Sequence, residues 1–216
     1  MLSLYVDSAA RDDVEPLLDV GIFRGITTNP TILDRAGLSG RDIPEVYRWA
    51  VAAGAQEVFV QTWGDSADEL EKRGRELAEL GDKVVIKVAA TRSGTRAASR
   101  LAAEGIPVLI TVVYSAMQAV SAACAGATYL APYVGRMADA GRDARIETVA
   151  MVELLRASES ATRVLAASVR STADLVYLTR HGVDAFALPP AVANALFDER
   201  LTEESAATFD AISARW

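Results

Sequence analysis

The sequence predicts an α/β fold, a (β/α)8 TIM barrel with an extra C-terminal helix, and three observations support this. Eight short apolar runs recur along the 216 residues, at the spacing of roughly 26 residues typical of barrel units. Stretches with the helical spacing of apolar residues separate these runs. Glycines stand where each helix would give way to a strand, because a helix C-terminus often needs a left-handed residue. They are Gly21, Gly54, Gly81, Gly105, Gly126 and Gly182.

Most of the expected strands are nearly continuous apolar runs, which is typical of parallel strands covered on both faces. They span residues 2–7, 25–29, 58–61, 84–88, 108–113, 128–132, 163–168 and 184–188. A doubly wound open sheet shares the strand–helix alternation and is the alternative. Such a sheet normally has a glycine-rich phosphate loop after its first strand, where this chain has Asp7-Ser8-Ala9-Ala10. We therefore favour the barrel.

The stretches between the strands are expected to pack an apolar face on the barrel. Between the sixth and seventh strands, Ile146, Val149, Val152 and Leu155 recur every three residues and are predicted to be buried together. Cys124 lies on an apolar helix face, and we expect it to be an inert core residue.

One segment, residues 202–216, remains after the eighth strand–helix unit of a single domain over residues 1–216. Thr202 followed by two glutamates is a reasonable helix start, and Phe209, Ile212 and Trp216 share a face. A ninth helix has no place in the ring. We therefore expect its apolar face to cover a barrel end or a neighbouring subunit.

Composition narrows the class of protein. With 51% apolar and 24% charged residues, the chain can bury a sizeable core. No basic leader precedes an apolar segment, and no apolar stretch approaches the roughly 18 residues of a membrane helix. A net charge of −7 argues against nucleic acid as a partner. The lone Cys124 and the lone His181 leave no disulfide and no evident metal site. We expect a soluble, cytoplasmic protein that needs no metal or other cofactor and binds no membrane.

Polar residues gather at the expected C-terminal ends of the strands, where barrel enzymes place their active sites. Seven of the eight ends carry a hydrogen-bonding or ionisable side chain. The candidates are Asp7, Thr27, Asn29, Gln61, Lys87, Thr111, Tyr133, Arg136, Ser168 and Arg170. A single Thr or Asn of this set could simply cap a loop, but this explanation is much weaker for the set as a whole.

Among these residues, Lys87 gives the strongest indication of catalysis. The chain has three lysines against nineteen arginines, yet it keeps a lysine inside the apolar run 84–88. Burial there would lower the lysine pKa and leave a neutral amine that can attack a carbonyl and form a Schiff base. An iminium accepts electrons, so an adjacent C–C bond could break without a metal. A structural ion pair with Asp7 across the barrel is the alternative.

A Schiff-base lyase also needs a group that moves protons. Tyr133 is the candidate acid/base, acting through a water held by Gln61 and Thr111; the alternative is a packing residue at the barrel mouth. Asp7 could orient the lysine or hold a substrate hydroxyl. His181 stands at an expected helix end, where capping a carbonyl is the better interpretation.

An anion site is predicted after the later strands. Arg136, Ser168 and Arg170 come from adjoining strand–helix loops, where barrels often bind phosphate.

The candidate residues lie in segments that resemble a known family along nearly the whole chain. These segments are Tyr5-Val6-Asp7, Gly25-Ile26-Thr27-Thr28-Asn29-Pro30-Thr31, Val85-Ile86-Lys87-Val88, Gln118-Ala119 with Ala125-Gly126-Ala127, Ala131-Pro132-Tyr133-Val134-Gly135-Arg136 and Val164-Leu165-Ala166-Ala167-Ser168. In this order they resemble the short transaldolase family, most closely its fructose-6-phosphate aldolase branch. The Thr-Thr-Asn-Pro and Pro-Tyr-Val-Gly-Arg segments are specific to it.

The resemblance implies a (β/α)8 barrel and a metal-independent Schiff-base mechanism in carbohydrate metabolism, such as the pentose phosphate pathway. Lys87 would be the nucleophile, and Tyr133 the acid/base with Gln61 and Thr111 around its water. The substrate would be a small sugar phosphate. The chain would assemble as a ring-type homo-oligomer, a pentamer or decamer, with its last helix on a neighbour.

By the same resemblance, the remaining candidates bind substrate. Asp7, Thr27 and Asn29 would hold the dihydroxyacetone part, and Arg136, Ser168 and Arg170 the phosphate.

The branch within the family depends on three positions. Transaldolases of this size generally have Glu, Asn and Phe where this chain has Gln61, Leu109 and Tyr133. The combination of Gln61 and Tyr133 resembles the aldolases, so we expect cleavage of fructose 6-phosphate, or a close analogue, to dihydroxyacetone and glyceraldehyde 3-phosphate. A transaldolase that transfers dihydroxyacetone between sugar phosphates or sulfo-sugars is the alternative.

Two departures from the family pattern concern the substrate. The segment Lys87-Val88-Ala89-Ala90-Thr91 lacks the proline that usually follows Lys-Val, and Ala187 replaces a common threonine. The acceptor or the tail of the ketose could therefore differ, and a 6-sulfo sugar would suit the same anion site. A non-catalytic sugar-phosphate-binding barrel is the alternative from another class of protein.

Overall fold

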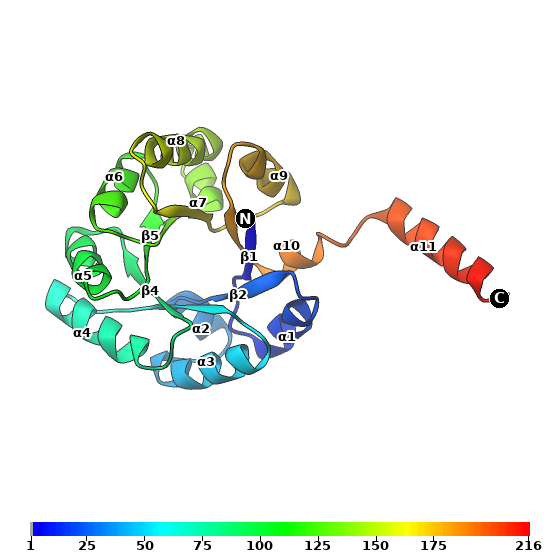
Figure 1. The fold of residues 1–216 in the computed structure, drawn as a ribbon, viewed down its shortest axis with the longest axis horizontal. Coiled ribbons are helices and arrows are strands. Elements are labelled where there is room, and N and C mark those ends of the chain that lie inside the picture. The colour runs from blue at the N-terminus through cyan, green and yellow to red at the C-terminus, as the bar shows by residue number, and fades with distance from the viewer. Residues whose placement is uncertain (1) are drawn as a thin grey trace.

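Eight parallel strands close into a barrel in chain order, and helices surround it as a ring (Figure 1). The structure is a computed structural model that describes residues 2–216; Met1, part of the predicted domain, lies outside them. The strands are β1 (Ser3–Val6), β2 (Phe23–Thr27), β3 (Glu57–Gln61), β4 (Val84–Ala89), β5 (Val108–Val113), β6 (Tyr129–Pro132), β7 (Arg163–Ala166) and β8 (Ala185–Leu188). Each lies within or overlaps one predicted run, so the predicted (β/α)8 barrel is confirmed.

Helices follow the strands and cover the outside of the barrel. They are α1 (Arg11–Asp19), α2 (Pro30–Arg35), a 3-10 turn η1 (Gly40–Asp42), α3 (Ile43–Ala52), α4 (Ala67–Ala78), α5 (Arg92–Ala103), α6 (Met117–Cys124), α7 (Val134–Asp139), α8 (Ala144–Ala157), α9 (Thr172–Arg180), α10 (Pro190–Asn194) and α11 (Arg200–Ser213). No helix in residues 2–216 is long and apolar enough to cross a membrane.

The strands form because both of their faces are buried. Side chains such as Val58, Val60 and Ile86 pack outward under the helices, whereas Tyr5 and Phe59 fill the barrel interior. This arrangement explains why the runs are continuously apolar.

The lower end of the interior, at the N-terminal ends of the strands, is closed by a polar network. Glu57 accepts hydrogen bonds from the hydroxyls of Tyr5 at 2.5 Å and Tyr129 at 2.9 Å. Arg24 donates to the same carboxylate at 2.6 Å. The interior is therefore filled at this end, and the site must lie at the other.

The joints between helices and strands confirm the glycine prediction. All six predicted joint glycines have positive φ, for example 71° at Gly126 and 91° at Gly182. At position 25 a glycine is required for a different reason: a Cβ there would lie 1.8 Å from the Glu57 carbonyl oxygen of the adjacent strand.

Two expectations about buried helix residues are wrong. Ile146 in α8 is 64% exposed, whereas Thr148 and Met151 are buried. A step of three residues turns a helix by only about 300°, so a row at that spacing drifts off the buried face. Cys124, at the end of α6, is exposed rather than a core residue.

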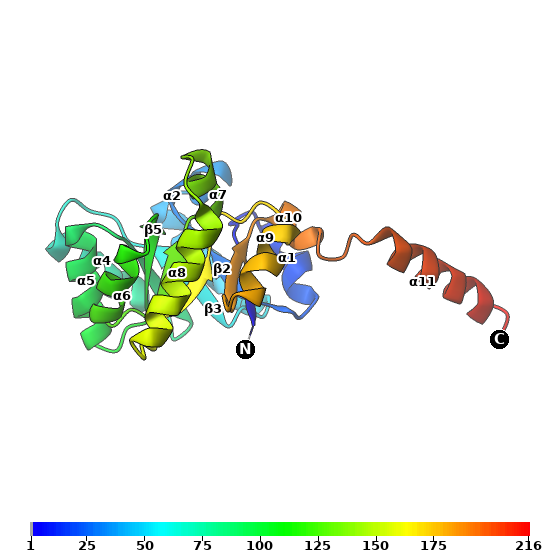
Figure 2. The ribbon, with the colours of Figure 1, turned by 90° about the horizontal axis from the view of Figure 1, so that it is seen from above.

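The C-terminal helix exists, but its predicted start is wrong. It begins at Arg200, and the Glu199 side chain accepts the Leu201 backbone N–H at 3.1 Å. In both views α11 extends away from the barrel (Figures 1 and 2). Its residues are all exposed, including Phe209 and Ile212. It therefore covers neither end of its own barrel.

Candidate active site

A cavity of about 260 Å³ opens at the C-terminal ends of the strands. Seven of the ten predicted site residues line it: Asp7, Asn29, Lys87, Tyr133, Arg136, Ser168 and Arg170. Thr27, Gln61 and Thr111 do not line this cavity. The structure thus brings most of the candidates together from five different strands, β1, β2, β4, β6 and β7.

Lys87 lies in β4, which pairs with β3 on one side and β5 on the other. Its Cα pairs with those of Gln61 and Leu109 on the flanking strands, and its side chain is buried. Its Nζ donates a hydrogen bond to the Thr28 carbonyl oxygen at 2.7 Å. Burial lowers the Lys87 pKa to about 8, although the Asp7 charge acts in the opposite direction. The amine is therefore neutral in a useful fraction of molecules near neutral pH.

The alternative explanation of Lys87, a structural ion pair with Asp7, is not what the structure shows. Among the described residues, the hydrogen-bond partner of the Lys87 ammonium is the Thr28 carbonyl oxygen. Asp7 instead accepts a hydrogen bond from the Thr27 hydroxyl. A backbone carbonyl does not neutralise the lysine, so the amine can lose its proton.

The lowered pKa predicts a pH profile. We expect kcat/KM to rise with pH through a midpoint near 8, because the neutral amine is the nucleophile and its pKa lies below the usual 10.5. Below the midpoint, kcat/KM should fall about tenfold per pH unit. Steady-state rates between about pH 6 and pH 10 measure this. A midpoint near the usual lysine pKa would contradict the assignment.

Tyr133 lines the same cavity as Lys87 and lies at the end of β6. The Thr111 hydroxyl donates to the Tyr133 oxygen at 3.2 Å, so the phenol proton is left for another acceptor. Burial raises the Tyr133 pKa above its usual value. Burial thus favours the protonated form of Tyr133, and the Thr111 hydroxyl holds the Tyr133 oxygen in place.

The strand after Thr111 is irregular. Val112 has φ of 62°, which is unusual for a β-branched residue, and the pairing register shifts between Ile110 and Val113. Backbone strain of this kind clusters at functional sites. Ser168, which unlike Val112 lines the cavity, also has a positive φ of 57°.

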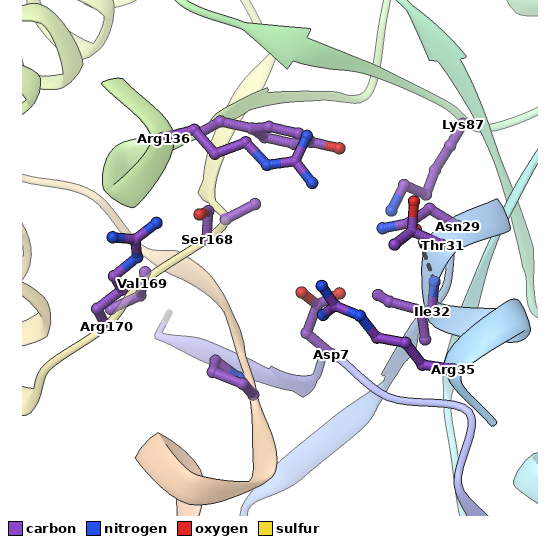
Figure 3. Close-up of a pocket in the computed structure, with 13 residues that line it drawn as sticks. Asp7, Asn29, Thr31, Ile32, Arg35, Lys87, Arg136, Ser168, Val169 and Arg170 are labelled. Atoms are coloured by element: carbon purple, nitrogen blue, oxygen red, sulfur yellow. Dashed lines mark hydrogen bonds between the residues drawn. The ribbon is translucent and has the colours of Figure 1, made fainter. Parts of the chain in front are cut away.

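The first two strand ends supply hydrogen-bonding groups. Thr27 lies behind Asp7 and holds its carboxylate. Asn29 caps α2 by accepting the Ile32 backbone N–H at 3.0 Å (Figure 3). The amide nitrogen of Asn29 remains available to the cavity that Asn29 lines.

Gln61 is placed differently from the prediction. Although its Cα pairs with that of Lys87, its side chain lines a neighbouring cavity of about 320 Å³ together with Asn29 and Trp63. Its role around a catalytic water stays a prediction.

The predicted anion-binding residues form a cluster on one side of the cavity (Figure 3). Arg136 lies over the Tyr133 ring at 4.9 Å. Arg170 forms two hydrogen bonds with the Asp139 carboxylate, one of them 2.5 Å long. A Cβ at Gly135 would lie 2.6 Å from the Arg170 Nε, so a glycine there lets the arginine pass.

Sequence reasoning missed three contributions to this site. The Thr28 carbonyl carries no side-chain signal, and Asp139 lies far from Arg170 in sequence. Arg35 lines the cavity from α2, and only its position shortly after the Thr-Thr-Asn-Pro segment could have suggested this.

The cavity is cationic in an acidic chain. Its lining includes Lys87, Arg35, Arg136 and Arg170 against the single carboxylate of Asp7, whereas the whole chain carries a net charge of −7. Within residues 2–216, no three His, Cys, Asp or Glu side chains gather as metal ligands. A buried amine beside a phenol and arginines can form an imine with a ketone that carries an anionic group.

Comparisons with known proteins identify the family. The family described as "Transaldolase/Fructose-6-phosphate aldolase" matches residues 4–216. A "Probable transaldolase" of Hydrogenobaculum sp. (strain Y04AAS1) is 34% identical over 202 residues, covering 94% of this chain and 92% of the relative. Another, from Jannaschia sp. (strain CCS1), is 34% identical over 215 residues and covers 100% and 96% of the two chains.

Solved structures show the fold alone. A mandelate oxidase R163L structure with 2-hydroxy-phenylacetamide aligns with a TM-score of 0.62 at 15% identity, over 88% of this chain and 65% of that one. The chain therefore spans about two thirds of the length of this structure.

The barrel fold and the matching family define a metal-independent Schiff-base enzyme. The chain belongs to the transaldolase/fructose-6-phosphate aldolase family, a class of metal-independent Schiff-base enzymes, over nearly its whole length. The resemblance to the short transaldolase family is thereby confirmed.

Proposed function

We propose that the protein is a class I aldolase that cleaves or forms a ketose phosphate, with fructose 6-phosphate or a close analogue as substrate. The products of cleavage are dihydroxyacetone and glyceraldehyde 3-phosphate. The observation that carries this proposal is the buried Lys87 amine, with its pKa lowered to about 8, in one cavity with Tyr133 and the Arg136–Ser168–Arg170 cluster.

The first half of the reaction forms the imine. The neutral Lys87 amine attacks the C2 carbonyl of the ketose and gives a carbinolamine. Tyr133 starts protonated because burial raises its pKa, so it donates its proton to the carbinolamine hydroxyl. Water leaves, and an iminium on Lys87 and a phenolate on Tyr133 remain.

The second half breaks the carbon–carbon bond. The Tyr133 phenolate takes the proton of the C4 hydroxyl while the C3–C4 electron pair moves into the iminium and gives an enamine. Glyceraldehyde 3-phosphate leaves with the C4 aldehyde. Protonation of the enamine at C3 and hydrolysis of the imine release dihydroxyacetone and free the Lys87 amine.

The cluster gives the substrate its orientation. A phosphate bound by Arg136 and Ser168 would fix one end of the ketose while Lys87 holds C2. A sulfonate is also a tetrahedral anionic group and would fit the same donors, so a 6-sulfo ketose is a close analogue in this sense.

A transaldolase is the second candidate, and the names of the relatives favour it. It would keep the dihydroxyacetone enamine until a second aldehyde arrives. Our preference for an aldolase depends on Gln61 and Tyr133 at positions where family transaldolases generally have Glu and Phe.

A donor screen with and without an acceptor aldehyde tests the proposal. We expect glyceraldehyde 3-phosphate to appear from fructose 6-phosphate without any acceptor. An absolute need for an acceptor, such as erythrose 4-phosphate, would identify a transaldolase instead. Binding of the sugar phosphate without any turnover would identify the non-catalytic barrel.

We also propose that the chain forms a ring-type homo-oligomer, a pentamer or decamer, in which residues 202–216 pack on a neighbouring subunit. The support is that α11 leaves its own barrel with Phe209 and Ile212 exposed (Figure 2). Sedimentation velocity of the full chain measures the assembly, and a monomer would contradict it. The cytoplasmic location stays a prediction.

A further inference from the structure

A buried threonine carries the backbone group that contacts the Lys87 amine. Thr28 follows the last residue of β2 and is 1% exposed. Its carbonyl oxygen accepts the hydrogen bond from Lys87 Nζ at 2.7 Å, and Figure 3 shows the Lys87 side chain extended toward Asn29, the next residue of this segment. Within residues 2–216, Lys87 is the only donor to this carbonyl. A buried carbonyl needs a donor, and here the lysine supplies it.

The Thr28 side chain fixes the position of this carbonyl. The backbone N–H of Thr28 donates to the Phe59 carbonyl oxygen at 3.0 Å, and the Thr28 hydroxyl donates to the same oxygen at 2.9 Å. Phe59 belongs to β3, which pairs with β2 on one side and with β4, the strand of Lys87, on the other. Thr28 is thus attached to the strand beside Lys87 by two hydrogen bonds, and one of them depends on the hydroxyl.

The second attachment is needed because the chain leaves the sheet directly after Thr28. The pairing of β2 with β3 ends at Thr27 and Phe59. Asn29 is the cap residue of α2, and Pro30 is its first residue. No further pair of the two strands therefore follows Thr28, and its hydroxyl takes the place of the hydrogen bonds that a longer strand would supply.

The hydrogen bond from Lys87 determines which way the amine faces. A neutral amine attacks a carbonyl carbon through its lone pair, so rotation about the Cε–Nζ bond decides whether attack is possible. One Nζ hydrogen points to the Thr28 carbonyl, and Thr28 does not line the cavity. The lone pair is thereby left for the cavity that Lys87 lines. Imine formation leaves one hydrogen on the iminium nitrogen, which the same carbonyl can accept.

We propose that Thr28 is a positioning residue. Its hydroxyl, bonded to the Phe59 carbonyl oxygen, holds the Thr28 carbonyl where it turns the lone pair of Lys87 toward the bound carbonyl substrate. This inference rests on the proposed function, since it needs Lys87 as the nucleophile. It adds to the reaction a side chain that lies outside the cavity.

Thr28→Val is the test, because valine keeps the β-branched shape and removes the hydroxyl. The Phe59 oxygen keeps the backbone N–H of residue 28, so no buried acceptor is left unpaired. We expect imine formation with dihydroxyacetone to slow about tenfold, since small misplacements of a reacting group are costly. Thr28→Ser keeps a hydroxyl and should restore most of the rate.

The rate is measured by mixing the full-length protein with dihydroxyacetone, reducing with borohydride after increasing times, and quantifying the Lys87 adduct by peptide mass spectrometry. The measurement is made at about pH 9, where the amine is largely neutral in both proteins. A change in the Lys87 pKa then does not disguise a change in the orientation of the amine.

The pH profile is a second readout, which a general loss of stability would not move. A hydrogen bond accepted from the ammonium favours the protonated form of Lys87, so a loosened carbonyl should lower the Lys87 pKa. We therefore expect the midpoint of the kcat/KM profile of Thr28→Val to lie below that of the wild type, by roughly half a pH unit.

Thr162→Val is the matched control. Thr162 is also buried, and its hydroxyl donates to the Ala127 carbonyl oxygen at 2.7 Å. It directly precedes β7, at the lower end of the barrel. Within residues 2–216 the Ala127 oxygen has no other donor, so Thr162→Val should lower the thermal unfolding midpoint at least as much as Thr28→Val. It should leave the rate of imine formation and the pH profile unchanged.

Two outcomes would overturn the role of Thr28. One is a Thr28→Val protein with the wild-type rate of imine formation, and the other is a rate that Thr28→Val and Thr162→Val lower equally, which would reduce the effect to destabilisation. Trapping in the wild type separates these failures from failure of the proposed function. An adduct on wild-type Lys87 with either outcome rejects the role of Thr28 only, whereas absence of any adduct rejects the Schiff-base function itself.

Discussion

Replacing Lys87 by methionine is expected to abolish turnover, with kcat lower by on the order of 10⁴-fold or more, because among the described residues Lys87 is the only lysine that lines the cavity. Methionine has nearly the length of lysine and suits a buried position in β4. The fold should therefore persist, and circular dichroism and thermal unfolding check this.

Trapping identifies the nucleophile independently of turnover. Borohydride reduction of the wild type with dihydroxyacetone should place one reduced adduct on Lys87, located by peptide mass spectrometry. Lys72→Met is the matched control, because Lys72 lies on the exposed face of α4, with 79% of its side chain accessible. Label on Lys72 or Lys83 in the wild type, or normal activity in Lys87→Met, would reject the mechanism.

Replacing Tyr133 by phenylalanine has the second largest expected effect. The hydroxyl is lost, but the ring keeps its edge-on packing against Tyr114, with 5.9 Å between the ring centroids, and its position under Arg136. Loss of general acid/base catalysis typically costs about 10²–10⁴-fold in rate. We expect kcat to fall by this amount, and borohydride trapping at Lys87 to fall far less.

Tyr129→Phe is the control for this experiment. Its hydroxyl belongs to the Glu57 network at the lower end of the barrel, so its loss should affect the free energy of unfolding but leave kcat within about threefold. A Tyr133→Phe enzyme with near wild-type kcat would remove Tyr133 from the proton-transfer steps.

The sequence could predict the barrel because the signals are local. A parallel strand covered on both faces needs a continuous apolar run, and a helix end in the left-handed conformation favours glycine. Both patterns are visible without knowing any contact between distant residues. The order of the strands then follows from two rules: consecutive strands usually lie side by side, and the crossovers between parallel strands are right-handed.

The candidate nucleophile, Lys87, was also predictable, for a related reason. A charged residue inside an apolar run is costly to bury, so Lys87 between Ile86 and Val88 already indicates a functional role. The structure adds the cause of its lowered pKa, which is burial, and its hydrogen bond to the Thr28 carbonyl, 59 residues away in sequence.

Only the tertiary structure decided which polar groups share the cavity. Thr27 and Gln61 lie at strand ends as predicted. However, the Thr27 hydroxyl donates a hydrogen bond to Asp7, and Gln61 lines the neighbouring cavity. Arg35 showed no pattern in the sequence, because an arginine at the end of a short helix is ordinary. Its place in the cavity wall depends on the direction in which α2 leaves β2.

The C-terminal helix shows the same division. The sequence by itself determined that residues near 202–216 form a helix with an apolar face, since local spacing is enough for this. Which surface the apolar face packs on cannot be predicted from periodicity, because the same pattern would suit the helix's own barrel or another chain. The tertiary structure decided it: α11 points away from the barrel with its apolar residues exposed.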